Sequence, residues 1–381
     1  MKGSTRFFFR LSQPILKNED YITSKYRHLK SEYKTPKYPL VLCHGFSGFD
    51  KLTLFAKPQL AFDQAILAAE QLKKSSEEKR REKEHNQAQL LISLSYWRGI
   101  QEALENLGST VFIAKVPAFG DIKSRAISLD KFITKQCKIL RESESKKSIY
   151  NDEKHKNEAD PRTFKQKNQP IKINLISHSM GGLDCRYLIS KVHRKDEIYR
   201  IVSLTTISTP HHGSEVADFI VDQVGQNSVL EQICPRSIYE LTTKKMKEFN
   251  KDVVDVPNVK YFSFGAKFNP RWYNLFNVTW LIMKHEIEKN ASKKALKEDK
   301  TRANNCIDKN KLIDNDGLVS VESSKWGQYI GTLDNVDHLD LINWTNQARL
   351  EFDKLMWAQD PPFNPIALYL DIADKLAHRG L

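Results

Sequence analysis

The sequence predicts an α/β fold with a mainly parallel central sheet flanked by helices. Short, β-branched apolar runs recur along the 381 residues. Their hydrophobicity is continuous rather than alternating, which is typical of strands buried on both faces. Amphipathic segments lie between them, and this alternation predicts a parallel sheet covered by helices. With 40% apolar residues, a chain of this length can bury a sizeable core.

The elements follow from these patterns in order. Strands are expected in five apolar runs, at residues 38–43, 110–116, 171–177, 200–208 and 259–266. Helices are expected where apolar residues recur with helical spacing, at residues 96–107, 122–140 and 183–192.

Two kinds of segment interrupt or precede this core. We expect a basic N-terminal segment over residues 1–37 and a single α/β domain over residues 38–381. Stretches near 73–89, 141–169 and 285–311 are dense in Lys, Glu, Asn and Ser. They contain too few apolar residues to offset the cost of ordering. We therefore interpret them as insertions into the domain, the first of which could be helical.

The amino-acid composition indicates which kinds of partner the protein can bind. No apolar run approaches the 18 residues that a membrane span needs. The net charge of +13 is spread through mixed-charge segments without a zinc-finger, helix-turn-helix or RNA-binding signature, so nucleic acid is not expected. A basic face for an anionic lipid surface fits better, which predicts peripheral membrane contact. Five cysteines without CxxC spacing are expected to be mainly free thiols.

The N-terminus resembles a mitochondrial presequence in composition. Lys2, Arg6, Arg10 and Lys17 precede the first acid, Glu19, and no secretory apolar region is present. The alternative is an ordinary basic terminus. We expect a mitochondrial protein, with the cytoplasm or the lipid-droplet surface as alternatives.

Ser179 lies where an apolar run gives way to a helical pattern, in "LISHSMGG". A nucleophile elbow puts its serine on a strained strand-to-helix turn, so only small residues fit two positions before and after it. Ser177 and Gly181 occupy those positions, although the usual first residue is glycine. The alternative is a plain turn closed by Gly181 and Gly182.

A nucleophilic serine needs a histidine base that is oriented by a carboxylate, and in this kind of fold they follow in the order Ser, Asp, His. Asp316 in "LIDNDGLVS" and His338 in "LDNVDHLDLINW" fit this order. Asp314 is the runner-up acid. Asp334 and Asp337 fit less well because they crowd the loop of the histidine.

The tetrahedral intermediate needs two backbone N–H donors. Met180, after the nucleophile, offers one. The turn after the first strand, "VLCHGFSG", offers the other at Phe46, because Gly45 lets the backbone turn inward. We expect His44 to brace this loop by hydrogen bonds rather than to act in the chemistry.

Two other groups of residues are candidates near the site. His211 and His212 in "STPHHGS" follow a strand, and we expect them to be rim or packing residues. The segment "RWYNLFNVTWLIM" (271–283) could lie over the site as a lid that contributes Trp272, Phe276 and Trp280. The alternative for each aromatic residue is the core.

Five motifs in the right order carry a family resemblance: "VLCHGFSG", "LISHSMGGLDCRYL", "LTTISTPHHGSEVAD", "NDGLVSV" and "DHLDLINW". Together they resemble the α/β-hydrolase lipases of the bacterial triacylglycerol lipase type and, more closely, the mitochondrial triacylglycerol lipases of yeast. The resemblance covers most of the chain from residue 39 onward. It implies an α/β-hydrolase domain with Ser179 as nucleophile, His338 as base, Asp316 as acid, and Phe46 and Met180 as oxyanion donors.

The resemblance also bears on metal binding. In the bacterial relatives an aspartate two residues past the catalytic histidine binds a structural calcium, and Asp340 matches it. Four residues further on, where the relatives have a glutamine ligand, this chain has Trp344. No cofactor is therefore expected, and Asp340 remains a weak calcium candidate.

The function expected is a carboxylic ester hydrolase that acts on lipids, most simply a triacylglycerol lipase working through an acyl-enzyme. The same triad also serves phospholipases, thioesterases and acyltransferases, and these remain alternatives. A non-catalytic, membrane-associated scaffold is a further alternative, against which the complete set of site residues argues.

Overall fold

The computed structural model describes residues 21–46, 51–55, 91–154, 169–194, 198–225, 235–270, 274, 276–297, 313–344 and 363–381. The predicted insertion at 73–89 and the first 20 residues lie outside this part of the chain. So does Trp272, which we expected in a lid.

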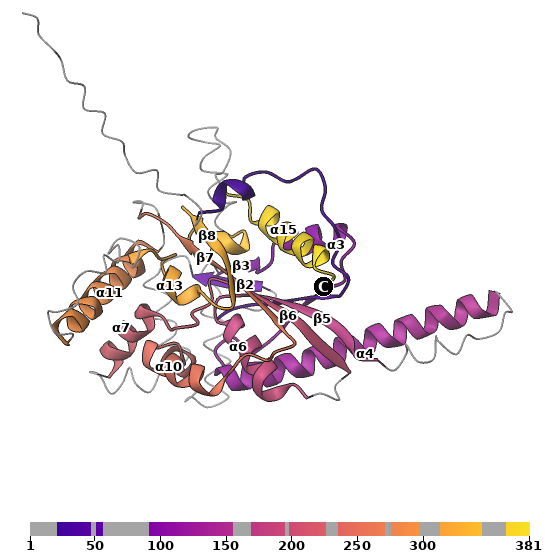
Figure 1. Cartoon of the computed structure of the whole chain (residues 1–381), viewed down its shortest axis with the longest axis horizontal. Coiled ribbons are helices and arrows are strands. Elements are labelled where there is room, and N and C mark those ends of the chain that lie inside the picture. Colours follow the sequence, from indigo (N-terminus) through magenta and orange to yellow (C-terminus); the bar gives the residue numbers. More distant parts are fainter. Residues whose placement is uncertain are drawn as a thin grey trace, which may run out of the picture.

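A six-stranded parallel sheet forms the centre of the molecule, and this confirms the predicted fold class (Figure 1). Its strand order is β4-β1-β5-β6-β7-β8. The strands are β1 (Leu40–Cys43), β4 (Val111–Ile113), β5 (Ile171–His178), β6 (Tyr199–Ile207), β7 (Lys260–Lys267) and β8 (Gln328–Asp334). Five of them coincide with the predicted runs. The sixth, β8, was not predicted, because Gln328 and Gly331 interrupt its hydrophobicity.

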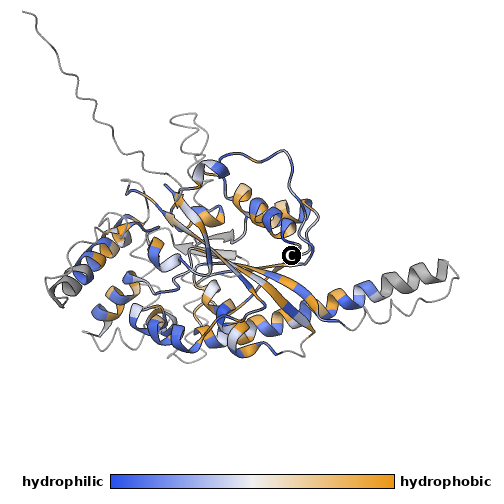
Figure 2. Ribbon diagram, viewed as in Figure 1, coloured by the Kyte–Doolittle hydropathy of each residue, from blue (hydrophilic) through white to orange (hydrophobic). Residues whose placement is uncertain are grey.

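Helices cover both faces of the sheet (Figure 1). On one face lie α3 (Ile100–Asn106) and α15 (Pro365–His378), and on the other lie α4 (Ile122–Lys154) and α6 (Gly181–Tyr187). Alternate strand residues enter the two layers: Leu40 and Leu42 join the first core, and Val41 and Cys43 join the second. Figure 2 shows the resulting band of hydrophobic residues along the central strands.

The remaining elements surround the sheet. They are the antiparallel pair β2 (Lys51–Phe55) and β3 (Leu91–Ser95), and helices α7 (Glu215–Val224), α9 (Arg236–Glu240), α10 (Thr243–Asp252), α11 (Asn277–Lys297) and α13 (Val321–Ser324). A π-helical turn covers Leu188–Val192, and 3-10 turns cover Thr23–Tyr26 and Asp340–Ile342. Helix α4 continues to residue 154 and α11 to residue 297, so each enters a predicted insertion. No helix among the described residues is long and apolar enough to cross a membrane.

Residues 21–37, from the predicted N-terminal segment, pack against the domain. Tyr26 is buried, and its hydroxyl donates to Asp371 of α15 at 3.1 Å. The Ile22 N–H donates to the Thr332 carbonyl of β8 at 3.0 Å. The Lys37 N–H donates to the carbonyl of Leu381, the last residue, at 2.7 Å. These contacts join the two ends of the described chain.

The strand order reverses at β1, which pairs with β4 on one side and β5 on the other. The connections that leave β1 and β5 therefore diverge at one edge of the sheet. Such a switch point is where open α/β sheets place their ligands. Cys43 and Ser177 are direct partners across the two strands, so the residues that follow them emerge side by side.

Candidate active site

Ser179 occupies a strained turn between β5 and α6. Its φ of 55° is left-handed, which is uncommon for a residue with a side chain, and its N–H donates to the Ile207 carbonyl at 3.0 Å. The neighbouring positions admit no bulk: a Cβ at Gly181 would lie 2.6 Å from the His44 carbonyl oxygen, and a Cβ at Gly182 would lie 2.2 Å from Thr209 Oγ1. This is the geometry that a nucleophile elbow requires.

Asp316 and His338 form a buried acid–base pair. His338 Nδ1 donates to Asp316 Oδ2 at 2.6 Å. The second carboxylate oxygen of Asp316 accepts the N–H groups of Leu318 and Val319 at 3.0 and 2.8 Å. The His338 N–H also donates to the Asp316 carbonyl at 3.0 Å, which ties the two loops together. The bond to Asp316 fixes the orientation of the His338 ring and uses Nδ1, so Nε2 takes no part in it.

The pair lies beside the elbow. The ring of His338 packs on that of His178 at a centroid distance of 4.5 Å and an angle of 44°. His178 is the last residue of β5 and immediately precedes Ser179. The structure thus places the Asp316–His338 pair against His178, the neighbour of Ser179, at the carboxyl edge of the sheet, although Ser179 and His338 are 159 residues apart in the sequence.

The other carboxylates considered as the acid have different partners. Asp314 pairs with Lys267 at 3.1 Å and accepts from the hydroxyl of Tyr21. Asp334 lies 3.8 Å from the same lysine. Asp337 Oδ1 accepts the N–H groups of residues 339 and 340 and so caps a short turn. Asp316 is the carboxylate that meets the imidazole.

The loop after β1 passes directly over Ser179. A Cβ at Gly45 would lie 2.7 Å from Ser179 Cβ, so only glycine allows this approach. The next N–H, that of Phe46, and the N–H of Met180 donate to no group within the described part of the chain. His44 braces the loop, because its Nδ1 donates to the Gly45 carbonyl at 2.9 Å and its Nε2 accepts the N–H of Val116.

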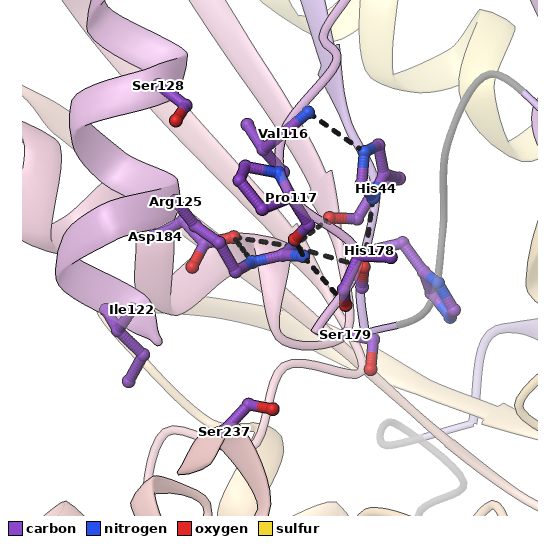
Figure 3. Close-up of polar contacts among 12 residues, drawn as sticks. His44, Val116, Pro117, Ile122, Arg125, Ser128, His178, Ser179, Asp184 and Ser237 are labelled. Carbon is purple, nitrogen blue, oxygen red and sulfur yellow. Dashed lines mark hydrogen bonds and ion pairs between the residues drawn. The ribbon is translucent and has the colours of Figure 1, made fainter. Parts of the chain in front are cut away.

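Arg125 of α4, fully buried, holds this loop from behind (Figure 3). Its Nη2 donates to the carbonyls of His44 and Gly45 at 2.9 and 3.1 Å. Its Nη1 donates to the Pro117 carbonyl at 2.8 Å, and its Nε donates to Asp184 of α6 at 2.8 Å. Burial raises the pKa of Asp184 to about 6 although Arg125 opposes the shift. One guanidinium therefore joins three segments around the elbow.

Comparisons with known proteins identify the family. A family model for the α/β-hydrolase fold matches residues 38–226. Triacylglycerol lipase 2 of Saccharomyces cerevisiae is 39% identical over 358 residues, which cover 91% of this chain and 94% of the yeast protein. The chain belongs to the α/β-hydrolase family. This confirms the resemblance that the five motifs predicted.

The chain is also similar to more distant proteins. A triacylglycerol lipase of Pseudomonas fragi is 23% identical over 370 residues, covering 91% of this chain and 98% of that protein. Among solved structures, the Staphylococcus hyicus lipase has a TM-score of 0.49 and 15% identity, covering 92% of this chain and 98% of that one.

Two of the three residues expected in a lid of this α/β-hydrolase lie within the described chain. Phe276 is buried, with its ring edge-on to His338 at 6.4 Å between centroids. It packs so tightly on Gly317 that a Cβ there would lie 2.5 Å from Phe276 Cβ. Trp280 is half-buried, one turn further along α11. The Asn274 side-chain amide donates to Asp337 at 2.8 Å and anchors the start of this helix to the histidine loop.

His211 and His212 both pack on Trp326. His211 is fully buried, stacks on Trp326 at 5.2 Å and contacts Thr206 Oγ1 through Nε2 at 3.0 Å. Burial lowers the pKa of His211 well below its usual value, and the Arg186 charge lowers it further. These are packing contacts, in agreement with the prediction for His211.

The described residues around Asp340 do not fit the calcium site that the resemblance to bacterial lipases implies. Asp340 Oδ2 accepts the N–H of Asp337, and Asp337 caps the same turn in return. Trp344 stands where an oxygen ligand would be needed. In the described part of the chain, no group of three or more His, Cys, Asp or Glu side chains could hold a metal ion.

Sequence reasoning missed three residues that organise the site: Arg125, Asp184 and Tyr96. Arg125 and Asp184 lie on the predicted helices, where a charged residue is ordinarily solvated, and nothing local marks them as buried. Tyr96 lies at the start of a predicted helix that in fact begins at Ile100. Each makes its decisive contacts with residues more than 50 positions away in the sequence.

Proposed function

We propose that this protein is a serine ester hydrolase that cleaves acylglycerols, most simply triacylglycerol. The observation that carries the proposal is the 2.6 Å contact between Asp316 and His338 beside a left-handed Ser179. The relatives named triacylglycerol lipases, one of them 39% identical over nearly its whole length, support the choice of substrate.

The proposed reaction follows from the hydrogen bonds. Because His338 Nδ1 carries the proton donated to Asp316, Nε2 can accept the proton of the Ser179 hydroxyl. The serine oxygen then attacks the ester carbonyl, and the N–H groups of Phe46 and Met180 hold the oxyanion. His338 returns the proton to the leaving alcohol, and water hydrolyses the acyl-enzyme by the same steps.

The surroundings of the site suit an apolar acyl group. Phe46 packs edge-on against Phe119 at 5.3 Å, and Phe276 stands beside His338. Phe119 is 59% exposed, and Val278 and Leu281 on α11 are 67% and 58% exposed. All three follow the carboxyl ends of their strands, so we propose that they touch the lipid surface from which the substrate enters.

The test of the function is hydrolysis of short-chain and long-chain acylglycerols, phospholipids and acyl thioesters by the wild type and by Ser179→Ala. We expect acylglycerol turnover that falls about 10⁴-fold or more in the variant, together with loss of fluorophosphonate labelling. Ser128→Ala is the control and should keep wild-type turnover. The Ser128 hydroxyl, on α4 in Figure 3, donates to the Ser124 carbonyl of the same helix. Full activity in Ser179→Ala would refute the triad, and faster turnover of a phospholipid or thioester would replace the proposed substrate.

Contact with a lipid surface is tested by sedimentation with vesicles of phosphatidylcholine and phosphatidylserine. The triple variant Phe119→Ser, Val278→Ser and Leu281→Ser should bind at least tenfold more weakly than the wild type. Val254→Ser is the matched control, because Val254 is 60% exposed but precedes β7, at the opposite edge of the sheet. Equal loss in the control would contradict the proposed surface.

We propose a mitochondrial location on the basic, acid-free composition of residues 1–18. Fractionation of cells that express the tagged full chain, compared with a chain in which Arg6 and Arg10 are changed to Glu, tests this. Recovery of the unchanged chain in the cytoplasm or on lipid droplets would overturn the proposal.

A further inference from the structure

Tyr96 lies between the two loops that carry the proposed oxyanion donors. Its hydroxyl accepts the N–H of Gly45 at 3.0 Å and lies 2.7 Å from Nδ1 of His178. Both Tyr96 and His178 are buried. Gly45 immediately precedes Phe46, and His178 immediately precedes Ser179, so one hydroxyl connects the oxyanion loop to the elbow.

We assign the direction of each hydrogen bond from the protons that the two side chains carry. A phenol has one proton to donate, and its oxygen can accept. The Gly45 N–H donates to this oxygen, and we assign the phenol proton to the bond with Nδ1 of His178. With this assignment neutral His178 carries its own proton on Nε2.

Both groups stay neutral where the enzyme would work. Burial raises the pKa of Tyr96, so its proton is retained. Burial also lowers the pKa of His178 well below its usual value, and the neighbouring charge of His338 lowers it further. Of the other ionisable groups near the pair, Arg125 lowers the pKa of Tyr96 without overcoming the effect of burial. His44 packs on the Tyr96 ring, and Asp316 is held by His338 at 2.6 Å. The bond between Tyr96 and His178 therefore persists through the neutral pH range.

The other polar atoms of Gly45 are held as well. Its carbonyl accepts from Arg125 and from His44, while its N–H donates, among the described residues, to Tyr96. Catalysis by an oxyanion hole depends on donors fixed at the position that the developing charge will occupy. A displacement of about 1 Å at such a site can cost about 100-fold in rate.

We propose that Tyr96 and His178 are positioning residues that set the separation between the Phe46 and Met180 N–H groups, and that the His178 ring supports the plane of His338. This inference rests on the proposed ester hydrolysis. It predicts a defect in transition-state stabilisation rather than in substrate binding.

The first test compares Tyr96→Phe with Tyr369→Phe. Tyr369 is a buried tyrosine of α15 whose hydroxyl has no hydrogen-bond partner in the described chain, so it is a matched control. We expect Tyr96→Phe to lower kcat by about 10- to 100-fold with KM changed less than twofold. Affinity for an alkyl boronic acid, which forms a tetrahedral adduct with the serine, should fall by a similar factor. Tyr369→Phe should change none of these values.

His178→Asn separates the two contributions. Its amide oxygen can still accept from Tyr96, but the ring against His338 is lost, so we expect a smaller fall in kcat than in Tyr96→Phe and a shift in the pH profile of kcat/KM. Counting active sites with a fluorophosphonate corrects all rates for misfolded protein. Unchanged kcat in Tyr96→Phe, or a loss fully explained by fewer active sites, would overturn the proposal.

Amide hydrogen exchange tests the coupling by Tyr96 without depending on which substrate the enzyme cleaves. Faster exchange in the segment that contains residues 44–46 is expected for Tyr96→Phe and not for Tyr369→Phe, whatever the substrate. If the wild type hydrolyses no ester but this difference appears, the function is wrong and the coupling stands. Equal exchange in both variants refutes the coupling even if the enzyme is a lipase.

Discussion

Arg125 donates to Asp184 at 2.8 Å, and both side chains are buried, although 59 residues separate them in the sequence. The aspartate lies on the helix that begins just after the proposed nucleophile. The arginine lies on a different helix and also binds the loop that carries one oxyanion donor. The two halves of the site are thus joined from behind by a buried ion pair.

Arg125→Met should destabilise the protein by about 3 to 5 kcal/mol, because it leaves a buried carboxylate without its partner. Urea unfolding followed by circular dichroism measures this. Arg141→Met on the same helix is the control, since Arg141 is partly exposed, and should cost about 1 kcal/mol or less. The double variant Arg125→Met, Asp184→Asn should recover part of the loss. Equal stability of the two single variants would contradict the role of the ion pair.

Asp316→Asn and Asp314→Asn separate the two candidate acids. An amide at 316 cannot hold the imidazole in the required tautomer, so kcat should fall by about 10⁴-fold. Asp314 pairs instead with Lys267 on a partly exposed surface, so Asp314→Asn should change kcat less than about threefold. Steady-state hydrolysis of one soluble ester by both variants is sufficient. The reverse order would assign the acid to Asp314.

Glu215, the first residue of α7, should make stability depend on pH. Burial raises its pKa to about 7 from an ordinary 4.5. The folded state then binds the proton more tightly than the unfolded state, so the contribution of Glu215 to stability is greatest below pH 4.5 and is lost as the pH rises to about 7. The slope is at most about 1.4 kcal/mol per pH unit. Glu215→Gln should remove this decline in urea unfolding measured from pH 4.5 to 7.5.

The control for that experiment is Glu248→Gln, an exposed glutamate whose pKa is lowered by Lys245. It should retain the wild-type decline between pH 4.5 and 7. A decline of the same size in Glu215→Gln and the wild type would assign the pH dependence to another group, with Asp184 as the next candidate.

Deletion of the N-terminus should have two distinct outcomes. A chain that lacks residues 1–20 keeps every contact described for Tyr26, so its urea midpoint should match the wild type. A chain that lacks residues 1–37 removes a buried tyrosine from the core and should lose about 3 kcal/mol or more. Equal stability of the two would mean that residues 21–37 contribute nothing to folding.

Local patterns predicted much of the fold and the positions of the proposed triad. The strand before Ser179 is continuously apolar, the residues around the serine are small, and the order of acid and base follows from the fold. These signals lie within a few residues of each position. Strand β8 was not predicted, because Gly331 and its polar neighbours break the apolar run. It nevertheless completes the sheet beside β7.

Contacts between distant segments could not be predicted in this way. Tyr96, Arg125 and Asp184 look ordinary in the sequence, and their importance depends on burial and on partners that only the folded chain supplies. Helix α4 extends past residue 140 because a segment rich in Lys, Glu and Ser can still be helical when its charges are spaced to pair. Composition alone suggested an insertion there.

The contacts between Tyr26 and Asp371 and between Lys37 and Leu381 have a consequence for how the protein is made. At ordinary translation rates of about 5 to 20 residues per second, Asp371 leaves the ribosome about 20 to 70 s after Tyr26. Until then the N-terminal residues have no docking surface and stay open to other proteins. Docking of residues 21–37 therefore has to follow the synthesis of almost all of the described chain.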